Sequence, residues 1–289
     1  MAQFLVGYNT GVMNSPENVV FVGHSTLQWG LAVAFFALGG PLGAVYAGGV
    51  AETKGRKHAL IVDACCFLLG GVMQTCALNM VHVIIGRAVI GFASGFSTTI
   101  VPIYLGEMAP PALRGVLGTM TQFAMVIGIL IADLLAFPYS TSNGWRTLFG
   151  ITPLFAILML LLTPLLLESP RWLLNKDPDS QEARNIIRKL RGLRYQKEVE
   201  TEVEHFLGGN EVQRSSKKDD DTSIKGDWRT LVQDKSVRLM LISALVLQLG
   251  QQFSGINAVF YYSSSFFEGV VDNPMVGTTI VGAVNVVRA

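Results

Sequence analysis

Long apolar stretches with almost no charge are the feature that most restricts how this chain can fold. Stretches long enough to cross a membrane are Leu27–Ala51, His58–Leu78, Val81–Leu105, Val116–Phe137, Trp145–Leu167 and Val237–Phe260. Two shorter ones, Met1–Met13 and Met275–Val287, stand at either end. A helix needs roughly 20 apolar residues to cross a hydrocarbon core of about 30 Å. The sequence therefore predicts an all-α fold, a polytopic bundle of membrane helices in an integral membrane protein.

Charge is concentrated in one block of an otherwise apolar chain. Half of the residues are hydrophobic and 15% are charged, and most of the 22 Lys+Arg and 21 Asp+Glu lie between Glu168 and Arg238. Apolar residues recur there at helical spacing in two sets, Ile186, Ile187, Leu190 and Leu193, then Val199, Val203, Phe206 and Leu207. This pattern predicts two short amphipathic helices in water. We expect a transmembrane bundle over 1–170, a linker over 171–235 and the start of a second bundle over 236–289.

The basic residues between the apolar stretches predict the orientation of the chain. Lys54, Arg56 and Lys57 follow the second stretch, Arg114 follows the fourth, and the charged block follows the sixth. Loops rich in Lys and Arg stay on the cytoplasmic side of a membrane. We therefore expect the N-terminus and the charged block to be cytoplasmic.

The sequence offers no sign of catalysis. It contains no nucleophile–base pair, no phosphate-binding loop and no cluster of metal ligands. We expect neither an enzyme nor a cofactor or metal site. The net charge of +1 gives no reason to expect nucleic acid as a partner.

Ionisable residues inside membrane spans are costly and need an explanation. Arg87 begins its span, where a gating role and snorkelling of the side chain to the interface carry equal weight. Asp63 and Asp133 lie near the ends of their spans, so we expect both carboxylates at the interface. Gln122 lies two turns into its span and could hydrogen-bond a neighbouring helix or bind a ligand.

Charged residues also gather at the ends of the spans. Glu107 and Arg114 flank one short loop, and Glu168 and Arg171 follow the sixth stretch. Each pair could be an isolated surface contact worth about 0–1 kcal/mol. Together with Glu52 and Arg56, they could instead form a network between helix ends.

The stretch QLGQQFSGINAVFYYSS places amides where a bilayer offers no water. Gln248, Gln251 and Gln252 share one helical face, whereas Asn257 lies roughly 140° away on a regular helix. A break at Ser254-Gly255 would let all four amides face one cavity. Interrupted helices form substrate sites in transporters, and amides suit a neutral polyol because they both donate and accept hydrogen bonds.

Several motifs together resemble a known family. They are GYNTGV from Gly7, KGRK from Lys54, Gly86-Arg87, YLGEMAP from Tyr104, LRG from Leu113, ESPR from Glu168 and QQFSGINAVFYY from Gln251. With these motifs the chain resembles the sugar porter family of the major facilitator superfamily, most closely its facilitative glucose transporters. The match covers nearly the whole chain.

The resemblance implies two six-helix bundles joined by a cytoplasmic helical linker, with the sugar bound between them and released as one bundle rocks against the other. The chain would then hold a complete first bundle, the linker and a second bundle truncated within its second helix. The implied sugar ligands are Gln122, Gln251, Gln252, Asn257 and Asn285. The implied gating and charge network contains Glu52, Arg56, Arg87, Glu107, Arg114, Glu168 and Arg171.

The resemblance also bears on the energy source. Proton-coupled relatives carry an aspartate where this chain has Asn9, and asparagine cannot exchange a proton. We therefore expect facilitated diffusion of a hexose, glucose first, across the plasma membrane. A proton-coupled sugar symporter and a truncated, non-transporting sugar sensor or regulator remain as alternatives.

Overall fold

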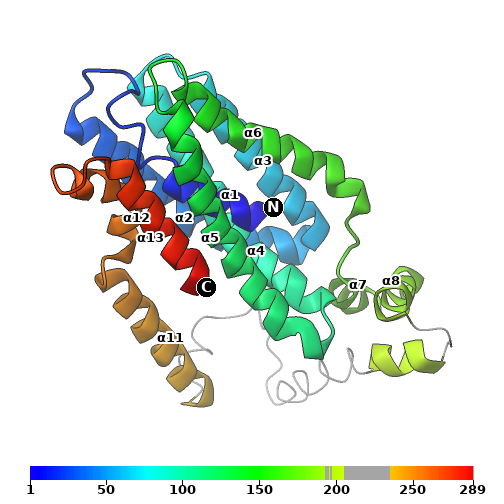
Figure 1. The fold of residues 1–289 in the computed structure, drawn as a ribbon. Helices are drawn as coiled ribbons and strands as arrows, with labels where there is room; N and C mark the ends of the chain where they lie inside the picture. Colours follow the sequence, from blue (N-terminus) through cyan, green and yellow to red (C-terminus); the bar gives the residue numbers. More distant parts are fainter. Residues whose placement is uncertain (193–194, 196, 205–234, 289) are drawn as a thin grey trace.

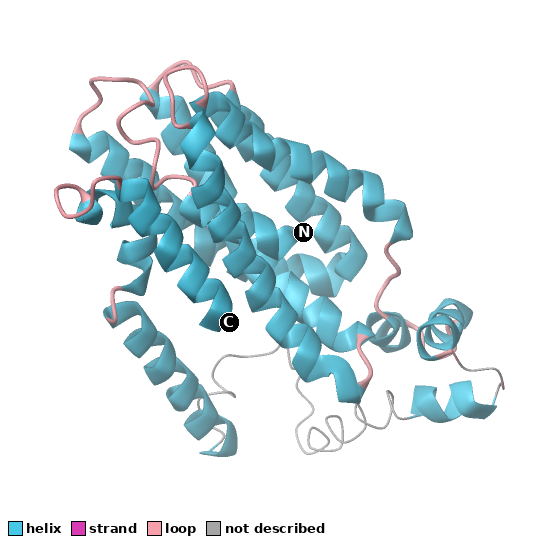
Figure 2. Cartoon of the chain, viewed as in Figure 1, coloured by secondary structure: helices cyan, strands magenta, loops and turns pink. Residues whose placement is uncertain are grey.

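A computed structural model of the chain describes residues 1–192, 195, 197–204 and 235–288. Within these ranges the regular structure consists of helices, with no strand, joined by short loops (Figure 2). The all-α prediction is confirmed.

Six helices form the first bundle (Figure 1). They are α1 (Ala2–Gly11), α2 (Thr26–Lys54), α3 (Arg56–Thr75), α4 (Met80–Met108), α5 (Arg114–Tyr139) and α6 (Trp145–Leu162). Local sequence sets several starts, since Ser25 and Gln28 form a reciprocal capping box before α2 and the Asn79 side chain caps α4. Helix α6 ends earlier than the apolar stretch suggests, because Pro164 falls in a 3-10 turn over Thr163–Leu165.

Helix α1 packs mainly against α5, α2 against α4, and α3 against α4 and α6. Glycines allow the close contact between α2 and α4, since a Cβ at Gly43 or Gly95 would collide with the opposite backbone. One apolar cluster joins Tyr8, Trp29, Val83 and Phe149 from four different helices. The bundle therefore has a continuous core around α1.

Two helices of the linker follow, α7 (Pro170–Lys176) and α8 (Gln181–Arg191), and residues 197–204 are helical. Ser180, and not the preceding Asp179, caps α8 by accepting from the Ala183 N–H. The apolar cluster of this region contains Leu174, Ala183, Ile187, Val199 and Val203. The two predicted amphipathic helices are thus confirmed in part, while Leu193, Phe206 and Leu207 lie outside the described residues.

The ion pairs of the linker hold its helices together. Arg184 bonds Glu200 at 2.9 Å and Arg191 bonds Glu202 at 2.9 Å. The Arg184 hydrogen bond to Glu200 raises the pKa of the guanidinium above its ordinary value.

Three helices follow the linker: α11 (Lys235–Phe253), α12 (Ile256–Phe267) and α13 (Pro274–Arg288). Gly255 lies between α11 and α12 with φ +71, a left-handed conformation that glycine adopts without strain. The break at Ser254-Gly255, which was the condition for the amides of this stretch to converge, is present in the structure. Helix α13 packs along α5, whereas every described side chain from Arg238 to Ala258 is exposed.

Within the described ranges, six helical segments are long and apolar enough to cross a membrane: Thr26–Lys54, Arg56–Thr75, Met80–Met108, Arg114–Tyr139, Trp145–Leu165 and Arg238–Phe267. Large apolar side chains such as Leu42, Val45 and Leu161 are exposed on their outer faces. Such surfaces belong against lipid chains, so the protein is an integral membrane protein.

Candidate functional site

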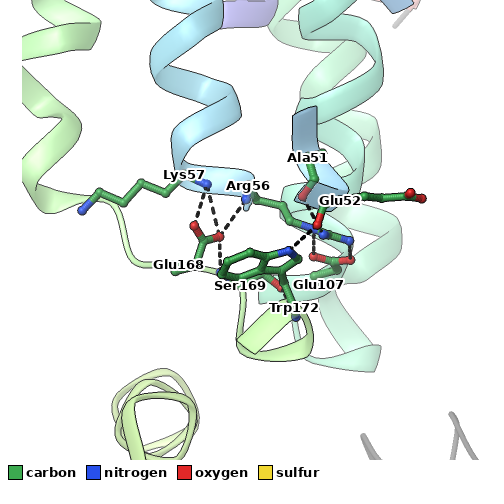
Figure 3. A network of polar contacts seen from close by, with 8 residues as sticks. All are labelled: Ala51, Glu52, Arg56, Lys57, Glu107, Glu168, Ser169 and Trp172. Atoms are coloured by element: carbon green, nitrogen blue, oxygen red, sulfur yellow. Dashed lines mark hydrogen bonds and ion pairs between the residues drawn. The ribbon is translucent and has the colours of Figure 1, made fainter. Parts of the chain in front are cut away.

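An ion pair joins the ends of α3 and α4. The Nε and Nη2 atoms of Arg56 donate to the two carboxylate oxygens of Glu107, both at 2.7 Å. Arg56 Nη1 also donates to the Ala51 carbonyl at 3.0 Å, at the end of α2 (Figure 3). The two charged side chains are only 13% and 10% exposed. One guanidinium therefore ties three helix ends through paired, charge-assisted hydrogen bonds.

Glu168 caps the N-terminus of α3 from a distant part of the chain. Its carboxylate accepts from the backbone N–H groups of Arg56 at 2.8 Å, Lys57 at 3.2 Å and Ser169 at 2.8 Å (Figure 3). A carboxylate at this position satisfies free N–H groups and complements the helix dipole. Gly55 makes room for it, because a Cβ there would lie 2.5 Å from the Glu168 Oε2 atom.

The other members of the proposed charge network lie differently. The Glu52 backbone carbonyl accepts from the Trp172 indole N–H at 2.9 Å, while the Glu52 carboxylate points away from the network (Figure 3). Arg114 is exposed and donates to the Ala109 carbonyl at 3.4 Å, and Arg171 has no polar partner among the described residues. The sequence did not single out Gly55 or Trp172, although the glycine of KGRK was a usable signal.

Arg87 is buried at the centre of the first bundle. Its side chain is 0% exposed, so the snorkelling interpretation is wrong. Nη1 donates to the Asn9 carbonyl at 2.7 Å, and the guanidinium lies 4.1 Å from the centre of the Phe36 ring. The Nε and Nη2 atoms have no partner in the part of the chain that the structure describes. Arg87 is therefore separate from the helix-end network around Arg56.

The polar neighbours of Arg87 lie on α1 and α6. The Asn9 carboxamide oxygen accepts from the Thr152 hydroxyl at 3.1 Å, and its NH₂ donates to the Leu5 carbonyl at 2.9 Å. Asn9 thus links α1 to α4 and α6 without a charge of its own.

Two acidic side chains are buried by other helices, which the sequence did not lead us to expect. Asp63 is 0% exposed and Asp133 is 4% exposed, so the prediction that both lie at the interface is wrong. The Ser97 hydroxyl donates to Asp63 Oδ2 at 2.5 Å, between α3 and α4. One oxygen of each carboxylate, Oδ1, has no hydrogen-bond partner within the described ranges. Their positions near the ends of spans did not reveal that other helices cover them.

The amides of the broken helix are brought together in part. The Asn257 amide donates to Gln252 Oε1 at 2.8 Å across the break at Gly255, although a regular helix would hold them on different faces. Gln251 is exposed on the end of α11, and Gln122 is exposed on α5. Asn285 is half-buried on α13. Among the described residues, a hydrogen bond joins only Gln252 and Asn257 of this set.

A polar cluster connects the first bundle to α12 and α13. The Asn14 amide donates to the Ser263 hydroxyl at 2.6 Å, and the Asn14 carboxamide oxygen accepts from the Ser264 N–H at 3.0 Å. Ser263 in turn donates to the Thr278 hydroxyl at 3.1 Å. The sequence analysis missed this cluster, because small hydroxyl side chains in apolar helices give no pattern.

No group of three or more His, Cys, Asp and Glu side chains that could hold a metal occurs in the described ranges.

Comparisons with known proteins point to one family. A model described as Sugar (and other) transporter matches residues 1–289. Solute carrier family 2, facilitated glucose transporter member 1 from Gallus gallus is 35% identical, over 96% of this chain and 59% of the relative. Solute carrier family 2, facilitated glucose transporter member 3 from Homo sapiens is 35% identical, over 99% of this chain and 60% of the relative.

The fold also resembles a solved structure. The xylose transporter XylE from E. coli, in a partially occluded inward open conformation, matches with a TM-score of 0.79 and 24% identity, over 99% of this chain and 68% of XylE. The chain spans about three fifths of the length of the two curated relatives.

Proposed function

Because the chain belongs to the Sugar (and other) transporter family, we propose that the protein carries a hexose, with glucose as the first candidate, across a membrane by facilitated diffusion. The bundles would expose the sugar to each side in turn. The printed names of the two curated relatives describe facilitated glucose transporters, which supports this choice of substrate.

The observation that carries this proposal is the break in the membrane segment at Gly255. It separates α11 from α12 between Gln252 and Asn257, and it lets these two side chains meet at 2.8 Å. These exposed amides, with Gln122 on α5 and Asn285 on α13, offer donors and acceptors without charge. Such a set matches the hydroxyl groups of a neutral sugar.

We assign the network around Arg56 to the cytoplasmic side. The basic residues Lys54, Arg56 and Lys57 lie at that end of α2 and α3, together with the linker helices. In this orientation the Arg56–Glu107 pair and the Glu168 cap hold the cytoplasmic ends of the first bundle as one body. The second bundle would then rock against a fixed surface. We propose the plasma membrane as the site of the protein.

Passive transport fits the surroundings of Arg87. Asn9 provides its carbonyl to Arg87 and its side-chain oxygen to Thr152, and no carboxylate among the described residues bonds the guanidinium. A proton-driven cycle at this position would need a group that gains and loses a proton.

The proposal is tested by sugar uptake into liposomes containing the purified protein. We expect labelled D-glucose to equilibrate faster than in empty liposomes, labelled L-glucose not to do so, and unlabelled D-glucose to compete. No uptake in liposomes where the protein is correctly folded would contradict the proposal and favour a sugar-binding regulator. Acidification of the lumen that follows sugar entry would instead indicate proton symport.

A further inference from the structure

Asp133 stands apart from the other buried polar residues because it lies where the two parts of the fold meet. It belongs to α5 of the first bundle, and α13 packs along that helix (Figure 1). The Asp133 Oδ2 atom lies only 3.0 Å from the position that a Cβ on Gly282 of α13 would occupy. The carboxylate is therefore covered by the backbone of α13, at a residue with no side chain of its own.

The surroundings of Asp133 do not neutralise a negative charge. Its Oδ1 atom has no hydrogen-bond partner, and the residue takes part in none of the ion pairs among the described residues. The Asn14 side chain lies within hydrogen-bonding reach of the carboxylate, but it is neutral and supplies no counter-charge. An unpaired charge in an apolar interface is strongly unfavourable, and a carboxyl group there favours its neutral, protonated form.

The helices packed against α5 bring few titratable groups towards this place. On their buried faces these are Tyr8 of α1 and Arg87 of α4, while α6 has none on its buried face and α13 has none between Pro274 and Val287. Tyr8 donates to the Leu148 carbonyl, and Arg87 donates to the Asn9 carbonyl and stacks on Phe36. Tyr261 and Tyr262 of α12 lie at the same interface with α1. Glu17 and Glu268 line a pocket that also contains Asn14, the neighbour of Asp133. None of these residues forms an ion pair with Asp133.

The position of Asp133 distinguishes it from Asp63. Asp63 lies between α3 and α4 inside the first bundle, where rigid-body rocking leaves its surroundings unchanged. Asp133 lies at the contact that rocking must open, near the end of α5 away from the Arg56 network. In the proposed orientation that end faces the extracellular solution.

We propose that Asp133 is a proton-binding site of the extracellular gate, and that closure of α13 over α5 takes up one proton from the outer solution. When the gate is open, water reaches the carboxylate and it ionises. When the gate closes, the carboxylate accepts a proton from hydronium and becomes a neutral carboxyl group, and opening returns that proton to the same side. The sugar therefore travels without a proton, while external pH sets how often the gate is closed.

This inference rests on the proposed alternating cycle and orientation, but it predicts a signal that needs no sugar. Because the closed state binds one proton more than the open state, lowering the pH favours closure, by up to about tenfold per pH unit. The sign follows from linkage: acid stabilises the state with more bound protons.

The test measures the distance between α5 and α13 directly. Spin labels are attached at Phe137→Cys and Ile280→Cys, both exposed positions, after Cys65, Cys66 and Cys76 are replaced by alanine. In the reconstituted protein, acidification should increase the fraction of short distances. Asp133→Asn mimics the protonated carboxyl and should keep the short-distance fraction high at every pH.

The matched control is Asp63→Asn, which removes an equally buried carboxylate within the first bundle and should leave the pH response intact. Infrared difference spectra should show a protonated carboxyl band that is lost in Asp133→Asn.

Distances that do not change with pH, or a pH response that persists in Asp133→Asn, would overturn the inference. A response to sodium at constant pH with none to protons would also overturn it. If the distances respond as expected but glucose is not taken up, the proton site stands and the proposed function fails.

Discussion

Arg56 and Glu107 are 51 positions apart in the chain and form a two-point ion pair, with both donor–acceptor distances at 2.7 Å. The pair joins the start of α3 to the end of α4.

Replacing Arg56 by lysine should lower the melting temperature of the purified protein. Lysine keeps the charge but cannot make two parallel hydrogen bonds to one carboxylate, so the loss should be about 1–3 kcal/mol. Arg171→Lys is the matched control, since Arg171 has no polar partner among the described residues, and it should melt like the unmodified protein. Equal melting of the two variants would show that the second hydrogen bond between Arg56 and Glu107 contributes no stability.

Gly55→Ala should destabilise the start of α3. Gly55 has φ +94, and an added Cβ would lie 2.5 Å from Glu168 Oε2 and 3.3 Å from the Trp172 ring. Strain of this kind and loss of the Glu168 cap together cost about 1–3 kcal/mol. Gly49→Ala in helix α2, where a Cβ meets nothing within 4 Å, should be neutral or slightly stabilising in the same melting experiment.

Asn9→Asp should stabilise the protein only while Arg87 is present. An aspartate at this position would place a negative charge near a guanidinium that already bonds the Asn9 carbonyl and whose Nε and Nη2 atoms have no partner among the described residues, and it should contribute about 1–2 kcal/mol. In an Arg87→Gln background the same change buries an unpaired charge and should destabilise. The four melting temperatures of this double-mutant cycle measure the coupling, and additive effects would show that Asn9 and Arg87 do not interact through their side chains.

Gln251→Leu should weaken sugar uptake more than it weakens folding. The substitution removes the exposed amide at the end of α11, and with it the proposed hydrogen bonds to a sugar hydroxyl. This loss costs about 1–2 kcal/mol, or roughly tenfold in apparent affinity. Leu249→Ala, an exposed change on the same helix, should leave the affinity unchanged. The concentration dependence of uptake, corrected for the amount of protein in the liposomes, provides the measurement. An unchanged affinity would remove Gln251 from the proposed site.

The sequence was most informative about features that depend on a single helical segment. Length and apolar composition suffice for the membrane helices. The spacing of Gln252 and Asn257 showed only that a regular helix keeps these two residues apart, so a break at Ser254-Gly255 was the condition for them to meet. Both inferences depend only on local structure.

The burial of Asp133 and the partner of Arg56 could not be predicted in this way. A position near the end of a span says how deep a residue lies, but not whether α13 covers it. The pairing of Arg56 with Glu107, rather than with another carboxylate, depends on how the ends of α3 and α4 meet. The functional roles of the amides and of the charge network stay predictions.

Gly40 and Gly95 provide a last prediction, because they touch each other and yet should tolerate alanine very differently. The missing Cβ of Gly95 on α4 points at the carbonyl group of Gly40 on α2, whereas the missing Cβ of Gly40 points into open space. Gly95→Ala must therefore push the two helices apart, and the bundle loses contacts along their whole interface. Gly40→Ala adds a methyl group on the lipid-facing side and leaves the interface intact.

We expect Gly95→Ala to reduce the yield of monodisperse protein in detergent and to lower its melting temperature, by an amount equivalent to about 1–3 kcal/mol for an overpacked contact. Gly40→Ala should match the unmodified protein in both measurements. Size-exclusion chromatography and thermal melting of the two variants, prepared side by side, provide the comparison. If the two variants behave alike, the backbones of α2 and α4 are not in close contact at Gly95, and the prediction is wrong.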